Sequence, residues 1–176
     1  MGGLVLLEKG EGTLEAQVVT PLRTGEYLAS KGVSLTLLSL LETLVIVGLT
    51  IGLGFNVLIL SVGVGLTAAF FMLAGFIVVA RYDSINEYLL PSVLYTALLS
   101  LPLLPYVGVS ESWLFYLHPL QPLLLLLQAA FRPVAAWQLI YGVVYSGLWL
   151  FLSYRFGQHT FYRFVISKEG TRRQQV

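Results

Sequence analysis

The chain has 176 residues, of which 57% are hydrophobic and only 11% are charged, and its mean hydropathy is +0.82. Soluble domains carry about 25% charged residues, so this composition leaves too little polar surface to face water. The net charge of +1 gives no electrostatic case for nucleic acid as a partner. The lack of cysteine excludes disulfides, thiolate metal sites and cysteine nucleophiles.

Long apolar runs follow a charged opening segment. The runs are Val33 to Phe55, Val57 to Ala80, Leu89 to Val109, Trp113 to Phe131 and Val134 to Tyr154. Most are close to the roughly 20 residues that a helix needs to cross a bilayer. The sequence therefore predicts an all-α, polytopic helical membrane protein that is embedded in the lipid bilayer.

The run from Trp113 to Phe131 is not expected to span, because it contains His118, two prolines and Gln121. Cytoplasmic loops carry an excess of Lys and Arg. With four spans, every Lys and Arg except Arg132 lies on one side, whereas five spans would place the basic tail outside. We therefore predict four transmembrane helices and an outer re-entrant or interfacial helical hairpin over this run. Its aromatic residues and the next tryptophan are expected near the outer headgroups: Trp113, Tyr116 and Trp137.

Three segments follow from this topology. Residues 1–31 are the end of a preceding helix and a cytoplasmic coupling segment, residues 32–155 form the transmembrane domain, and residues 156–176 form a basic cytoplasmic tail. Both termini are expected in the cytoplasm if the chain is a fragment. The tail charge is explained by topology and could also meet anionic lipid.

The opening segment, EKGEGTLEAQVVTPLRTGEYLASK, predicts a short amphipathic helix over Thr13 to Val19. Leu14 and Val18 are spaced i, i+4 and share one face. Thr20 is a candidate N-cap with Pro21 at the first position of the next helix. The alternative is an ordinary solvated loop, although this segment is longer than most connections between helices.

This segment resembles the cytoplasmic stretch of ABC-2-type transporter permeases. In that family, a Glu-rich Gly-Thr-Leu-Glu segment and a Thr-Pro-Leu turn lie between the second and third transmembrane helices. The matching residues here are Glu8, Gly12, Thr13, Leu14, Glu15, Thr20, Pro21, Leu22, Tyr27 and Lys31. The stretch ARYDSINEYLLPS, Ala80 to Ser92, is most similar to permeases of the fluoroquinolone-export type.

The resemblance covers nearly the whole chain and implies an export permease whose coupling helix docks on a separate ABC ATP-binding subunit. The residues implied to couple to the ATPase are Glu8, Glu11, Gly12, Thr13, Leu14, Glu15, Val18, Thr20 and Pro21. The family has six spans, so the first two transmembrane helices of the pattern are expected to be missing here. The permease would pair with itself or with another permease.

The sequence offers no nucleotide site of its own. A P-loop needs Gly directly before its Lys, and Ser30 precedes Lys31 in the nearest candidate. We therefore expect no enzymatic activity and no cofactor on this chain, with ATP on the partner subunit. His118 and His159 lie far apart without other ligands, so no metal site is expected. Asp83 and Glu87 are expected in a solvated inner loop that contacts the ATPase.

Glu42 lies near the middle of the first run. A carboxylate there costs about 2.5–3.5 kcal/mol on insertion scales and marks a candidate functional residue. Ser39, Glu42 and Thr43 are therefore a candidate translocation path, and the alternative is a carboxyl bonded to hydroxyls of a neighbouring helix. Glu42 also keeps open a proton-coupled small multidrug carrier. A third alternative is a non-transporting or truncated membrane subunit.

Gly48 and Gly52 form a GxxxG pattern, and Ser61 and Gly65 a small-xxx-small pair. Such patterns are typical of close helix packing in membranes. A permease dimer face is the alternative explanation of these patterns.

Overall fold

The computed structural model describes residues 24–52, 54–82, 84–109 and 112–161, together with Gly3 and Leu6. Within these ranges the chain is helical and contains no strand, which confirms the all-α class. The elements are α3 (Thr24–Ile51), α4 (Val57–Val79), α5 (Ile85–Leu99), the 3-10 helices η1 (Leu101–Val107) and η2 (Trp113–Leu117), α6 (Gln121–Ala129) and α7 (Ala136–Phe161). The predicted helix at Thr13 to Val19 lies outside the described residues.

Three of the described helices are long and apolar enough to cross a membrane: Ala29–Ile51, Val57–Val79 and Ala136–His159. A fourth crossing is possible if α5 and η1 together form one span, because this pair passes the same test but is bent by 49°. The described residues therefore form a polytopic membrane protein of three spans, or four if the bent pair is one span.

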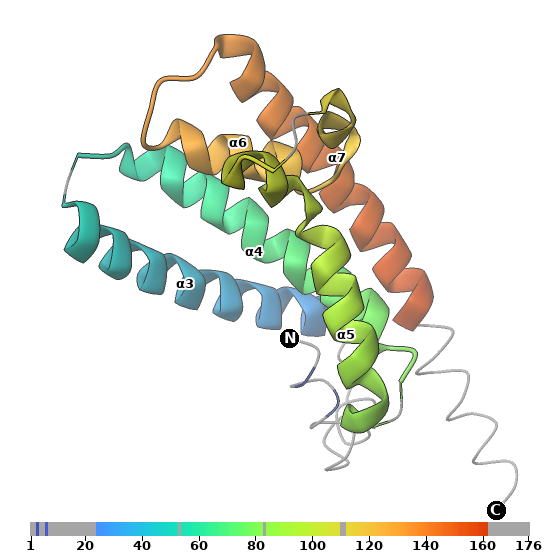
Figure 1. Cartoon of the computed structure of the whole chain (residues 1–176). Coiled ribbons are helices and arrows are strands. Elements are labelled where there is room, and N and C mark those ends of the chain that lie inside the picture. The colour runs from blue at the N-terminus through green and yellow to red at the C-terminus, as the bar shows by residue number, and fades with distance from the viewer. Residues whose placement is uncertain are drawn as a thin grey trace, which may run out of the picture.

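α3 runs antiparallel to α4, whereas α4 and α7 run in the same direction, as Figure 1 shows. A Cβ on Gly32, near the start of α3, would lie 2.9 Å from Sδ of Met72, towards the end of α4. Similarly, a Cβ on Gly157, near the end of α7, would lie 3.9 Å from Ile77. The described start of α3 and the end of α7 thus lie at the same end of the molecule as the α4–α5 connection, as an even number of crossings requires.

The turn between α3 and α4 follows from two residues. Gly52 has φ +79°, a left-handed conformation that glycine adopts without steric cost, and it ends α3. Asn56 is the N-cap of α4, and its side-chain oxygen accepts from the backbone N–H of Ile59 at 3.1 Å. The break predicted at Phe55-Asn56 is therefore present.

The third predicted run is divided rather than continuous. α5 ends at Leu99, and the backbone N–H of Ser100 still donates to the carbonyl of Thr96 at 2.9 Å. Pro102 and Pro105 have no N–H to continue the ladder, and a proline ring clashes with the preceding turn. The chain consequently continues as the 3-10 helix η1 after a 49° bend.

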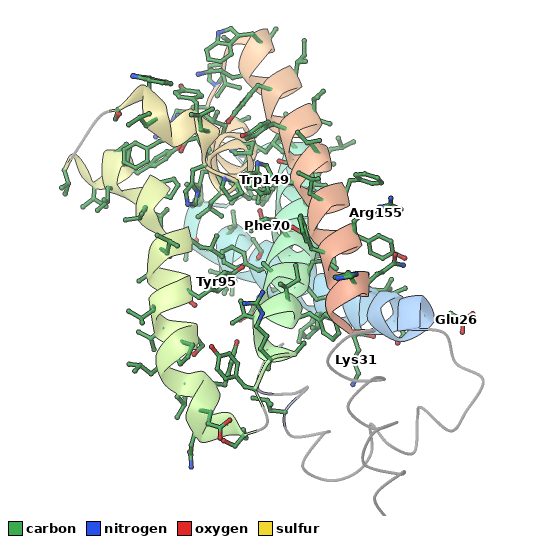
Figure 2. All side chains as sticks on the ribbon, turned by 90° about the vertical axis from the view of Figure 1, so that its right-hand side faces the viewer. Glu26, Lys31, Phe70, Tyr95, Trp149 and Arg155 are labelled. Carbon is green, nitrogen blue, oxygen red and sulfur yellow. The ribbon has the colours of Figure 1, made fainter. Side chains whose placement is uncertain are left out.

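The core of the described residues lies between α4, α6 and α7. Phe70 and Ala74 of α4 pack with Leu120 and Leu123 at the start of α6, and Leu99 of α5 joins them. Figure 2 shows Tyr95 of α5 and Trp149 of α7 gathered at the same cluster. A second cluster joins Leu60 and Val64 of α4 to Ala130, just after α6.

The GxxxG pattern of Gly48 and Gly52 does not mark a helix contact among the described residues, whereas other glycines do. A Cβ on Gly48 would meet no atom within 4 Å in the described part of the chain, and Gly52 lies beyond the end of α3. Gly65, in contrast, faces Thr36 of α3, whose Cγ2 would lie 3.9 Å from the added carbon. The Ser61 and Gly65 pattern therefore marks an internal packing face, whereas Gly48 lies on an open one.

Candidate functional site

The three predicted path residues lie on different sides of α3. Ser39 and Thr43 are half-buried, as is Thr36, which faces Gly65 of α4, while Glu42 is exposed. These three residues are close together along α3, but the neighbouring helix covers only the side that carries the hydroxyls. Within the described residues, Ser39 and Thr43 lie on the covered face of α3 and Glu42 does not.

Glu42 belongs to an uncovered apolar face of α3. Its neighbours on that face include Leu38, Leu41, Val45 and Leu49, which are 60%, 64%, 58% and 83% exposed. Within the described residues no helix covers this face. A mid-span carboxylate that faced lipid would be costly, so further protein or water must be next to it in a membrane.

The residues predicted to couple to an ATPase, Glu8 to Pro21, lie outside the described residues. The structure begins to describe the chain continuously at Thr24, where α3 starts with Glu26 in its first turn. An acidic residue in the first turn is favourable because it faces the positive end of the helix dipole. Among the described residues no group of three His, Asp or Glu side chains could hold a metal ion.

The run predicted to be a hairpin consists of η2, a turn at His118 and Pro119, and α6. The backbone N–H of Asn56 donates to the carbonyl of Ala130 at 2.8 Å, so α6 ends beside the start of α4. The start of α6 packs on Phe70, thirteen residues further along α4. At 1.5 Å per residue, the hairpin reaches about 20 Å along that helix.

Two glycines let α6 fit between its neighbours. A Cβ on Gly63 of α4 would lie 3.1 Å from Cδ2 of Leu127, and a Cβ on Gly142 of α7 would lie 2.8 Å from Cγ of Leu126. Each glycine lies six residues from the start of its helix, which corresponds to about 9 Å. Non-helical backbone at membrane depth is tolerated where protein buries it, and Leu120, in the turn that leads into α6, is 4% exposed.

Two tyrosines of α7 donate hydrogen bonds to η2, the first half of the hairpin. The hydroxyl of Tyr141 donates to the backbone carbonyl of Tyr116, and that of Tyr145 donates to the carbonyl of Leu117 at 3.0 Å. The two tyrosine rings stack on each other with centroids 5.2 Å apart. These hydrogen bonds supply partners for carbonyls that a short 3-10 helix leaves open.

Sequence reasoning did not identify these two tyrosines. Their i, i+4 spacing on a predicted span was the available signal, because it places both hydroxyls on one face. The predicted outer aromatic residues do gather at this end of the molecule: the rings of Tyr116 and Trp137 are 6.1 Å apart, and Trp113 is exposed.

Comparison with known proteins decides the family. The model of the fluoroquinolones export permease protein family matches residues 1–169. The chain belongs to this family. Two curated relatives, the fluoroquinolones export permease proteins of Mycobacterium tuberculosis strains CDC 1551 / Oshkosh and H37Rv, are each 37% identical over 173 residues. Each alignment covers 97% of this chain and 73% of the relative.

The match confirms the resemblance to ABC-2-type drug-export permeases drawn from the opening segment and from Ala80 to Ser92. No solved structure matches the chain. As a member of this export permease family with several apolar helices, the chain is a multi-pass membrane permease.

Proposed function

We propose that this fluoroquinolones export permease family member is the transmembrane subunit of an ATP-driven exporter in the cytoplasmic membrane. Its cargo would be drugs or other lipophilic and amphipathic compounds. The observation that carries this proposal is the family match over residues 1–169, which includes the opening coupling segment. ATP hydrolysis is assigned to a separate ABC ATP-binding subunit.

The mechanism has four steps. ATP closes a dimer of partner subunits, and these push on the predicted helix around Thr13 to Val19. The push passes through Thr20 and Pro21 into α3, and two permease copies or halves then switch access between their facing helices. Rigid-body motion of this kind needs a stiff lever. α3 is a suitable lever because it is continuous from Thr24 to Ile51.

The uncovered face of α3 supports an assembly of more than the described helices. This face carries Glu42 among leucines and valines that are more than half exposed. Another permease copy or a further helix at this face would remove the cost of exposing the carboxylate to lipid. The face therefore agrees with a permease that works as a homodimer or heterodimer.

The test is transport in inside-out vesicles that contain this chain with an ABC ATP-binding subunit. We expect accumulation of norfloxacin that requires ATP and both proteins. The matched control carries an ATP-binding subunit that cannot hydrolyse ATP. Equal accumulation with that control, or without the permease, would contradict the proposal.

A second candidate function follows from one observation, the exposed carboxylate of Glu42 near the middle of a candidate span. A proton-coupled carrier would use such a group as its protonatable site. In the vesicle experiment, this function predicts accumulation that is driven by a pH gradient without ATP.

A further inference from the structure

A pocket lies beside the hairpin, along α6 and at the start of α7. It has a volume of about 550 Å³ and takes lining residues from η1, η2, α6 and α7. Pockets for small molecules have volumes of about 300–1,000 Å³ and combine apolar walls with a few polar groups. This pocket is therefore large enough for a compound of two or three fused rings.

Four aromatic side chains form much of its wall: Tyr106 of η1 and Trp113, Phe115 and Tyr116 of η2. Aromatic rings attract other flat rings in offset-stacked or edge-to-face arrangements. Trp113 is 72% exposed, so its indole is accessible to an entering molecule. The wall therefore favours a planar aromatic ligand over a branched aliphatic one.

Three glutamines supply amide groups to the lining, which also contains Ser112. Gln121 and Gln128 are spaced i, i+7 on α6, so they share a face, and Gln138 comes from the first turn of α7. The Oε1 atom of Gln128 accepts from the hydroxyl of Tyr106 at 3.3 Å. The Oε1 atom of Gln138 accepts from the backbone N–H of Ala135 at 3.0 Å.

Because these two amide oxygens are engaged, the amide NH₂ groups remain as donors for a ligand. Gln121 is only 6% exposed, and its Oε1 has no hydrogen-bond partner among the described residues. This oxygen can only accept, so a ligand N–H or O–H group would supply the partner that it lacks. The glutamines therefore suit a ligand that carries carbonyl or carboxyl oxygens for the NH₂ groups of Gln128 and Gln138, together with an N–H or O–H donor for Gln121.

Among the described residues, the lining contains no Lys, Arg, Asp, Glu or His. The positive charge of Arg132, just after α6, nevertheless acts on Tyr106 in the wall. A ligand carboxylate gains from this charge, whereas a cationic group would lose its hydration without meeting a counter-charge in the described lining. The pocket therefore favours a molecule without net positive charge, including a zwitterion.

We propose that this pocket is a binding site for planar aromatic compounds that have no net positive charge and carry carbonyl or carboxylate oxygens. The rings would lie against Trp113 and Phe115, and the oxygens would accept from the glutamine amides. Its role as the last site that the cargo occupies before release rests on the proposed export function. Binding itself needs neither ATP nor a partner subunit.

The test uses the full chain in lipid nanodiscs without ATPase and follows the fluorescence anisotropy of norfloxacin, which has a fused aromatic ring system with a ketone and a carboxylate. We expect saturable binding that Trp113→Leu and Gln128→Leu each weaken about three- to tenfold, since each removes one interaction of about 0.5–1.5 kcal/mol. Phe156→Leu and Gln158→Leu are matched controls, because both side chains are exposed near the other end of α7. These controls should bind as the unchanged chain does.

Non-saturable uptake, or equal affinity of the pocket and control variants, would overturn the proposal. Thermal unfolding of each variant verifies that the fold is kept. Vesicle transport separates this site from the proposed function. ATP-driven export with unchanged binding in the Trp113→Leu and Gln128→Leu variants contradicts only the pocket, whereas pocket-dependent binding without ATP-driven export contradicts only the transport assignment.

Discussion

A Cβ atom on Gly142 would lie 2.8 Å from Cγ of Leu126, so α6 rests against the bare backbone of α7. Gly142 is buried at this contact. The carbonyl of Pro122 would lie 3.4 Å from the same Cβ, so the backbone of α6 as well as a side chain would meet the added carbon. The position of the hairpin between the spans therefore depends on Gly142 having no side chain.

We expect Gly142→Ala to lower the free energy of unfolding by about 1–3 kcal/mol, because overpacking forces side chains and backbone to shift. Gly147→Ala is the matched control on the same helix, since its added Cβ would meet nothing within 4 Å among the described residues. Alanine is the better helix former by about 1 kcal/mol, so the control should be neutral or stabilising. Thermal unfolding in detergent measures both, and equal melting temperatures for the two variants would contradict the proposed packing.

The hydrogen bond from Tyr145 to the carbonyl of Leu117 should hold η2 against α7. We expect Tyr145→Phe to cost about 0.5–1.5 kcal/mol and to speed hydrogen exchange in α6, because the carbonyl loses its partner while the ring remains. Tyr154→Phe is the control, since the Tyr154 hydroxyl accepts from Gln158, four residues further along the same helix. Exchange in α6 that is as slow in Tyr145→Phe as in the control would show that the bond does not anchor the hairpin.

The proposed coupling helix is tested by Leu14→Asp and Glu15→Lys. We expect both variants to insert into the membrane normally but to uncouple ATP hydrolysis from transport, because they alter the two faces predicted to dock on the ATPase. The measurement is stimulation of the partner's ATPase activity by substrate, with permease content checked in the membrane fraction. Unchanged stimulation would remove the coupling assignment.

Glu42→Gln distinguishes the two candidate functions. If export is driven by ATP, we expect both the variant and the unchanged chain to keep transporting norfloxacin after the proton gradient is collapsed. A proton-coupled carrier would instead lose transport when Glu42 is replaced, since a neutral amide cannot carry a proton. It would also lose transport when the proton gradient is collapsed. Norfloxacin accumulation in vesicles, with and without a protonophore, decides between them.

Much of the helical architecture could be predicted from local patterns. The second span was predicted at Val57 to Ala80 and is found at Val57–Val79, because apolar length and the Asn56 cap act within a few residues. Pro102 and Pro105 lie where regular α-helix gives way to η1, and Pro119 lies in the turn before α6, whereas Pro91 lies inside α5 without ending it. The family resemblance was also local, since it rested on short motifs.

Only the tertiary structure decided three features. They are whether a neighbour covers the side of α3 that carries Glu42, the fit of α6 between α4 and α7, and the pocket lined by Gln121 and Gln128. Hydropathy and helical periodicity state which residues share a face, but they do not state which neighbour covers it. That choice depends on contacts between residues distant in the chain, such as Gly63 with Leu127. The sequence by itself determined which segments are helices and which family they belong to, whereas long-range packing decided which polar side chains face protein and which remain uncovered.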